Sequence, residues 1–211
     1  MFTGLVQHVG VVRMRERHAS GERLLVDSAG WAHTPALGDS ISVNGCCLTI
    51  AQEPRSVHGA FVFDVIPETL SKTTLGELTP GTPVNLEHAA TMQTLLGGHL
   101  VQGHIDGIGV VKKVETKGEW RVTIEPEASL MEFLAPKGSV CVDGVSLTVA
   151  GLVGSPLRGG SLSQGMFEIA LIPTTLEKTT LKALTPGSRV NIECDPIGKQ
   201  VIWWMQRFHK G

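Results

Sequence analysis

Two short segments of the sequence carry a nucleophile-type side chain directly after a predicted tight turn. The Asn-Gly pair at 44–45 precedes Cys47-Leu48-Thr49, and the Asp-Gly pair at 143–144 precedes Ser146-Leu147-Thr148. Such pairs favour two-residue turns between strands. Residues two apart in a strand point to the same face, so each segment presents a thiol or hydroxyl beside a threonine hydroxyl. These groups can move protons and donate hydrogen bonds. The alternative is a purely structural turn, with Cys47 as a small buried hydrophobe.

Both segments belong to an internal repeat that covers most of the chain. GDSISVNGCCLTI at 38–50 matches KGSVCVDGVSLTV at 137–149, and GLVQHVGVV at 4–12 matches GHIDGIGVV at 103–111, both with a shift of 99 residues. Further on, 63–87 matches 169–193 with a shift of 106. The second copy is therefore seven residues longer. The excess falls at 151–166, a Gly- and Ser-rich stretch that predicts a surface loop.

Comparison of the two copies draws attention to polar residues that occur in only one of them. His104 stands where the first copy has Leu5, and Asp195 stands where it has Ala89. A polar side chain that the other copy does not need for folding indicates a function. For Asp195 the ordinary explanation is an exposed turn residue before a proline.

Each copy reads as a small β-structure that would position these side chains. Short β-branched stretches bounded by Gly or Pro predict about six strands. Pro67 and Pro173 each stand at the first position of a predicted short helix. Six strands and a helix in fewer than 100 residues favour a closed barrel, which leaves few exposed edges, over a β-sandwich. We therefore expect an all-β protein with two tandem homologous barrels, at 1–97 and 98–196.

The last residues, 197–211, break the repeat and predict a C-terminal α-helix. Ile197, Val201, Trp204, Met205 and Phe208 recur at helical spacing and form a wide apolar face. Such a helix either packs back on its own domain or associates with copies of itself. Composition favours packing back.

Composition and missing motifs exclude several classes of function. The net charge of −2 and the absence of Tyr argue against nucleic-acid binding. There is no predicted signal peptide or membrane span, and the four cysteines form no C-x-x-C pair, which indicates reduced thiols in the cytoplasm. No phosphate-loop, dinucleotide or G-x-S-x-G motif occurs. His99 and His104 lie too far apart for adjacent helix turns, so we expect no metal site.

Seven motifs together resemble riboflavin synthases of the alpha-chain type, in order and spacing. They are MFTGLVQ (1–7), NGCCLT (44–49), IPETLSKTTL (66–75), GGHLVQGH (97–104), DGVSLTV (143–149), LIPTTLEKTTL (171–181) and VNIECDP (190–196). The resemblance implies dismutation of two 6,7-dimethyl-8-ribityllumazine molecules, as the last step of riboflavin biosynthesis, without a cofactor. It also implies two six-stranded Greek-key β-barrels in each chain and a homotrimer assembled by the C-terminal helix. It leaves open an association with lumazine synthase.

The resemblance also assigns site residues to each repeat. For catalysis it indicates Ser40, Cys47, His104, Ser146, Thr148 and Asp195. The first pocket would be lined by Gly4, Leu5, Val6, Cys47, Leu48, Thr49, Ile66, Pro67, Glu68 and Thr69. The second would be lined by Gly103, His104, Ile105, Lys137, Ser146, Leu147, Thr148, Ile172, Pro173, Thr174 and Thr175.

Glu68 in the first copy corresponds to Thr174 in the second, so the two pockets are expected to differ in charge. Lumazine- and flavin-binding antenna proteins share the duplicated architecture but do not turn their ligand over. Polar residues in both predicted pockets favour the enzyme over such an antenna protein.

Overall fold

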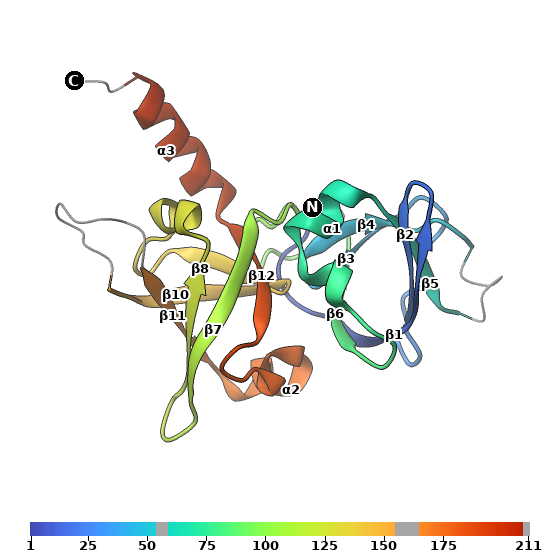
Figure 1. Ribbon diagram of the computed structural model, residues 1–211, viewed down its shortest axis with the longest axis horizontal. Coiled ribbons are helices and arrows are strands. Elements are labelled where there is room, and N and C mark those ends of the chain that lie inside the picture. The colour runs from blue at the N-terminus through green and yellow to red at the C-terminus, as the bar shows by residue number, and fades with distance from the viewer. Residues whose placement is uncertain (54–58, 155–164, 209–211) are drawn as a thin grey trace.

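Two groups of antiparallel strands lie side by side along the longest axis of the molecule (Figure 1), which is a computed structural model. The structure describes residues 1–53, 59–154 and 165–208. Each group has six strands and one short α-helix of six residues. The predicted all-β fold with two homologous barrel-like halves is confirmed.

The first half is a six-stranded sheet whose two edge strands are linked by a β-bridge rather than by a full ladder. Its strand order is β4-β3-β6-β1-β2-β5. The ends are joined by a single bridge between Ile50 and Phe63, next to a 2.8 Å hydrogen bond from Ala51 N to Val62 O. Its elements are β1 (His8–His18), β2 (Gly21–Asp27), β3 (Ser40–Val43), β4 (Cys46–Thr49), β5 (Phe61–Val65), α1 (Pro67–Lys72), η2 (Thr74–Glu77) and β6 (Pro83–His88).

The second half is a closed barrel with the strand order β10-β11-β8-β7-β12-β9. Its elements are β7 (Gly107–Glu115), β8 (Trp120–Pro126), η3 (Ala128–Phe133), β9 (Ser139–Val142), β10 (Val145–Val153), β11 (Met166–Leu171), α2 (Pro173–Lys178), η5 (Thr180–Ala183) and β12 (Arg189–Cys194). The barrel closes because β10 is longer than its counterpart β4.

The predicted loop at 151–166 is therefore partly wrong. Gly151, Leu152 and Val153 pair with Glu168, Phe167 and Met166, which extends the β10–β11 ladder into the Gly-rich stretch. Backbone hydrogen bonding between the strands overrides the weak strand propensity of glycine here. Residues 155–164 lie outside the described residues.

The two halves meet through a nearly two-fold symmetric set of buried hydrogen bonds. The Asn85 side chain donates to Asp143 O and accepts from Thr180 N, each at 2.8 Å. Its counterpart Asn191 donates to Asn44 O and accepts from Thr74 N, also at 2.8 Å. Each asparagine on a strand of one half thus binds the turn and the 3-10 helix of the other half. The sequence repeat therefore corresponds to a structural repeat, in which equivalent asparagines of each half bind the other half.

The C-terminal helix α3 (Pro196–Phe208) forms as predicted but projects away from the second barrel (Figure 1). Its apolar side chains stay exposed, including Val201 at 52%, Trp204 at 51% and Phe208 at 61%. The expectation that it packs back on its own domain is wrong, because most of its apolar side chains remain exposed, although Gln206 donates to Glu132 and Lys199 pairs with Asp106. Among the described residues, no helix has the length and apolar character needed to cross a bilayer.

Candidate functional site

The segment that opens each repeat lies against the nucleophile-type residue of the other repeat. Gly4 O accepts a 2.8 Å hydrogen bond from Ser146 N, and Gly103 O accepts a 2.9 Å hydrogen bond from Cys47 N. Both glycines have positive φ, +72° for Gly4 and +81° for Gly103. A Cβ on Gly4 would lie 2.6 Å from the Ser146 Cβ, and one on Gly103 would lie 2.5 Å from the Cys47 Cβ. Only glycine allows this conformation and this close approach.

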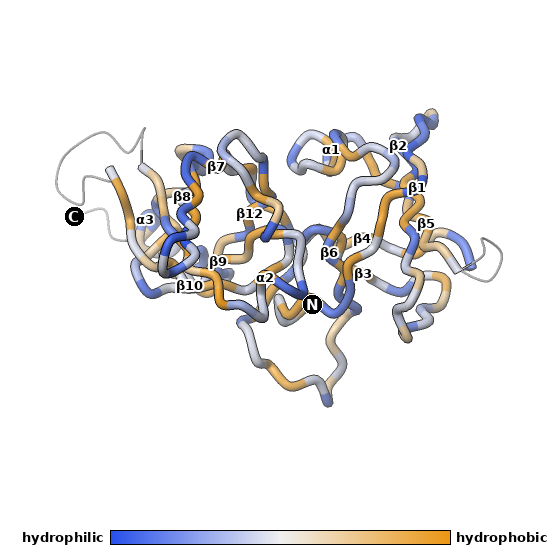
Figure 2. The backbone as a smooth tube through the Cα atoms, turned by 90° about the horizontal axis from the view of Figure 1, so that it is seen from below, coloured by the Kyte–Doolittle hydropathy of each residue, from blue (hydrophilic) through white to orange (hydrophobic). Residues whose placement is uncertain are grey.

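The side chains that follow these glycines cross in the same way. Val6 packs against the hydrophobic core of the second half, and Ile105 packs against the core of the first. The N-terminus accordingly lies between the halves in both views (Figures 1 and 2). The grouping of site residues by repeat is therefore not what the structure shows. Gly4 to Val6 lie beside Ser146, and Gly103 to Ile105 lie beside Cys47.

Ser146 has a partner that the sequence did not reveal. Its Oγ lies 2.7 Å from His99 Nδ1. The other ring nitrogen, Nε2, is buried and has no hydrogen-bond partner among the described residues. Burial lowers the pKa of His99, and the opposing charge of Asp195 only partly offsets this effect. The result is a neutral imidazole that can exchange a proton with a hydroxyl. His99 has no counterpart in the first repeat, but it lies in the GGHLVQGH motif at 97–104, which was the available signal for it.

Cys47 and Thr49 share one face of β4, as predicted. Cys47 is half-buried and Thr49 is exposed, whereas the intervening Leu48 is buried. Ser40 lies opposite Thr49 in the β3–β4 ladder, so both hydroxyls stand on neighbouring strands. Burial raises the pKa of the adjacent thiol of Cys46 to about 12, which keeps it protonated. Cys47 is thus the thiol directed to the candidate site.

In the second half Thr148 and Lys137 occupy the equivalent rim. Thr148 is exposed and lies opposite Ser139 in the β9–β10 ladder. Lys137 has a φ of +68°, where its counterpart Gly38 has +89°. A lysine in the left-handed region is uncommon and costs free energy that glycine avoids. This strain supports a functional reason for a cation at this position.

The remaining two polar candidates have structural roles in addition to any catalytic one. Asp195 Oδ1 accepts a 2.9 Å hydrogen bond from Ile197 N, and therefore caps the start of α3. His104 is exposed, and its backbone N–H donates to Glu193 at 3.1 Å. The turn explanation for Asp195 is thus part of its role, since the cap fixes the first turn of the helix.

A groove of about 750 Å³ separates the N-terminal segment from α2 of the second half. Leu5 and Val6 line one wall, and Glu177 and Lys178 of α2 line the other. The candidates Ile172 to Thr174, at the start of α2, are exposed near this groove, and Ile66 to Glu68 are exposed in the same way at the start of α1. Two exposed isoleucines, Ile66 at 57% and Ile172 at 63%, leave apolar surface at the starts of these two helices.

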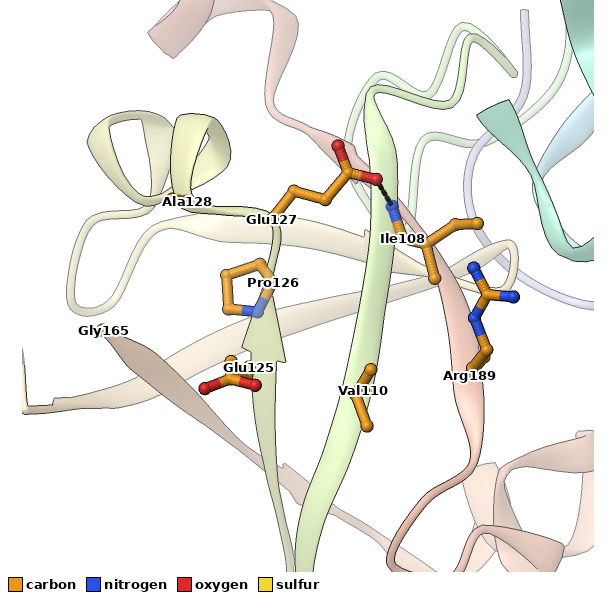
Figure 3. Close-up of a pocket in the computed structure, with 8 residues that line it drawn as sticks. All are labelled: Ile108, Val110, Glu125, Pro126, Glu127, Ala128, Gly165 and Arg189. Atoms are coloured by element: carbon orange, nitrogen blue, oxygen red, sulfur yellow. Dashed lines mark hydrogen bonds between the residues drawn. The ribbon is translucent and has the colours of Figure 1, made fainter. Parts of the chain in front are cut away.

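A smaller cavity, of about 250 Å³, lies elsewhere in the second barrel (Figure 3). Glu127 reaches over Gly107 there and accepts a 3.1 Å hydrogen bond from Ile108 N. Arg189 at its rim pairs with Glu77 of the first half. It contains no candidate residue, so we do not assign it to the site. Within the described residues no group of three or more His, Cys, Asp or Glu side chains is placed to hold a metal ion.

Comparison with known proteins identifies the family. The model of the lumazine binding domain matches twice, at residues 3–89 and 102–195. The riboflavin synthase of Mycobacterium bovis is 44% identical over 95% of this chain and 96% of its own length. That of Bacillus subtilis is 38% identical over 100% of this chain and 91% of its own.

A solved structure gives the same result for the fold. The crystal structure of LumP complexed with 6,7-dimethyl-8-(1'-D-ribityl) lumazine superposes with a TM-score of 0.73 and 25% identity, over 92% of this chain and 98% of that one. Family match, relatives and fold agree with the two-repeat architecture. The chain therefore belongs to the riboflavin synthase family and consists of two lumazine-binding domains.

Proposed function

We propose that this chain is a riboflavin synthase. It converts two molecules of 6,7-dimethyl-8-ribityllumazine into riboflavin and 5-amino-6-ribitylamino-2,4-pyrimidinedione, through transfer of a four-carbon unit from one lumazine to the other. The observation that carries this proposal is full-length similarity to riboflavin synthases, 44% over 95% of the chain, in a protein with two matching polar sites. The site with Cys47 and the site with Ser146 would each hold one lumazine.

A duplicated fold suits a reaction between two identical substrates. Holding both rings face to face supplies about 7–11 kcal/mol of the barrier as orientation. The 7-methyl group of the lumazine is acidic because its anion is delocalised into the ring. The protein therefore needs modest acid–base help, and hydrogen-bond donors that stabilise the developing anion. In the assembled protein the two pockets would meet across a subunit interface.

The candidate residues divide into groups that handle protons and groups that contact the ligand. Ser146 and His99 form the proton-handling pair of the second site, supported by their 2.7 Å contact. Cys47 takes the corresponding place in the first site. The hydroxyls of Ser40, Thr49 and Thr148, together with His104, Lys137 and Asp195, would donate to or accept from the ligand. The starts of α1 and α2, 66–69 and 172–175, would cover the rings and the ribityl chains.

The first test is incubation of the purified protein with the lumazine alone, without metal or cofactor. We expect riboflavin, followed by absorbance and fluorescence, in half the molar amount of lumazine consumed. The alternative is a chromophore carrier, which the similarity to the lumazine complex of LumP favours. Tight, stoichiometric lumazine binding without new flavin would establish that alternative and contradict the synthase.

We also propose that α3 assembles the chain into a homotrimer. Its exposed apolar residues support this, since Ile197, Trp203 and Phe208 are all more than half exposed. Deletion of 197–211 is expected to convert trimers into monomers, measured by analytical ultracentrifugation. Loss of riboflavin formation should accompany it if the pockets meet between subunits. A truncated protein that stays trimeric would contradict this assignment.

The remaining expectations complete the proposal. Residues 1–97 and 98–196 form the two lumazine-binding domains, and 197–211 form the oligomerisation segment. The enzyme would act in the cytoplasm, which is supported by four cysteines that are all free thiols. Association with lumazine synthase stays a prediction.

A further inference from the structure

Two glutamates that have no role in the proposed chemistry lie fully buried at equivalent positions. Glu87 on β6 is 2% exposed and Glu193 on β12 is 0% exposed. Neither forms an ion pair with a Lys, Arg or His side chain of the part of the chain that the structure describes. An unpaired buried carboxylate is costly unless hydrogen bonds compensate for its lost hydration.

The compensating hydrogen bonds come almost entirely from the backbone of the segments that open the repeats. Glu87 accepts from Thr3 N and Thr3 Oγ1 at 2.7 Å and from Gly4 N at 3.0 Å. Glu193 accepts from the N–H groups of Gln102, Gly103 and His104, at 2.7, 2.8 and 3.1 Å. Each carboxylate thus fixes the orientation of two or three successive peptide groups.

Those peptide groups belong to the glycines that contact the opposite site. The same Gly4 residue that donates to Glu87 accepts from Ser146 N of the second repeat at 2.8 Å. The same Gly103 residue that donates to Glu193 accepts from Cys47 N of the first repeat at 2.9 Å. A chain of hydrogen bonds therefore runs from each glutamate into the site of the other repeat.

We propose that Glu87 and Glu193 are positioning residues that act across the repeats. Glu87 holds the backbone against which Ser146 is placed, and Glu193 holds the backbone against which Cys47 is placed. Glu193 also fixes the backbone of His104. The catalytic part of this inference rests on the proposed synthase function, whereas the crossed positioning does not.

Substitution by glutamine isolates the contribution of the carboxylate. Glutamine has nearly the same shape, but one of its two polar atoms is an NH₂ donor. In either orientation that donor faces a backbone N–H, so at least one hydrogen bond to each opening segment is lost. Hydrogen bonds to an ionised group are the stronger kind, so the segment should loosen.

The test is amide hydrogen exchange, resolved by residue with NMR, on the full-length protein. In Glu87→Gln the Ser146 amide should exchange about 10-fold faster or more, and the Cys47 amide should keep its wild-type rate. In Glu193→Gln the Cys47 amide should accelerate and the Ser146 amide should not. The matched control is Glu119→Gln, which removes a carboxylate from an exposed ion pair with Arg121 and should change neither rate.

The opposite patterns would overturn the proposal. Acceleration of the amide in the same repeat as the substitution, equal acceleration of both amides, or no change at all would each contradict it. If a glutamine variant does not fold, Glu87→Asp and Glu193→Asp carry the same test. They keep the charge but draw the carboxylate back, and the crossed pattern should appear with smaller amplitude.

Enzyme kinetics gives a second readout that a general loss of stability would not produce. Glu87→Gln should lower kcat in the Cys47→Ala background as it does in the wild type, but should have little further effect in the Ser146→Ala background. For Glu193→Gln the two backgrounds should exchange roles. Equal effects in both backgrounds would contradict crossed positioning. If the wild type forms no riboflavin, the synthase proposal fails, whereas the exchange experiment still decides the positioning.

Discussion

Replacement of His99 with alanine is expected to lower kcat for riboflavin formation by about 10²-fold or more, the usual contribution of a positioned acid or base. The reason is the 2.7 Å contact between His99 Nδ1 and Ser146 Oγ, which is the closest side-chain pair of the candidate site. Without the imidazole, Ser146 Oγ has no hydrogen-bond partner among the described residues that could take or return its proton. Steady-state kinetics at pH 7 measures the effect, and KM should change much less than kcat.

Two variants separate proton transfer from hydrogen bonding and from general perturbation. His99→Asn places an amide oxygen near the position of Nδ1, so it keeps an acceptor for Ser146 but not a basic one. It should be as slow as His99→Ala, and wild-type activity would contradict a proton-transfer role. Glu119→Gln removes the charge of an exposed side chain that pairs with Arg121 in the second barrel, and should leave kcat unchanged.

The acid side of the pH profile follows from the same environment. Burial lowers the pKa of His99 below the ordinary histidine value near 6.5. If the neutral imidazole is the active form, kcat should rise with pH through this lowered pKa and level off above it. In His99→Ala this limb should disappear.

Replacement of Asp143 with asparagine is expected to stabilise the protein at pH 8 by about 4 kcal/mol. Burial raises the pKa of this carboxyl from 3.8 to about 7, although the hydrogen bond from Asn191 N opposes the shift. The folded protein therefore holds a proton on Asp143 between about pH 4 and pH 7 that the unfolded chain has released. Stability must fall as the pH rises through this window, and no further loss occurs above it.

The repeat itself provides the model for this substitution. Asn44 occupies the equivalent turn with the same φ of 45°, and its Oδ1 accepts from Asn85 N at 2.7 Å as Asp143 Oδ1 accepts from Asn191 N at 2.8 Å. Chemical denaturation of Asp143→Asn and the wild type at several pH values measures the difference. It should be near zero at pH 4 and largest at pH 8. The reverse variant Asn44→Asp should lose stability at pH 8, and a gain there would contradict this account.

The sequence predicted the fold well because turn pairs and helix-starting prolines act locally, on the residues next to them. The Asn-Gly and Asp-Gly pairs form the tight turns β3–β4 and β9–β10, and the prolines at 67 and 173 begin α1 and α2. The extension of β10 to Val153 was missed, because its pairing with β11 depends on a distant strand rather than on the Gly-rich residues themselves.

The site was only partly accessible from the sequence, for a geometric reason. An alignment of the repeats assigns Gly4 and Cys47 to the first copy and Gly103 and Ser146 to the second. It therefore predicts that each glycine lies at the site of its own copy. The backbone exchanges these partners between the copies, and no one-dimensional alignment can express such an exchange. His99 was missed for a related reason, since comparison of the copies cannot evaluate a residue that has no counterpart.

The exchange of opening segments also bears on the origin of the chain. In a single ancestral copy with this backbone, the opening segment would not reach its own site. Two such copies could complete both sites by exchanging their opening segments, as in a domain-swapped dimer. Gene fusion would turn that encounter into an intramolecular one, with an effective concentration in the millimolar range for a short connection. The connection between β6 and β7 then guarantees one site of each kind in every molecule. After fusion the two copies could diverge, and in the present chain the two sites differ, with Cys47 in one and Ser146 beside His99 in the other.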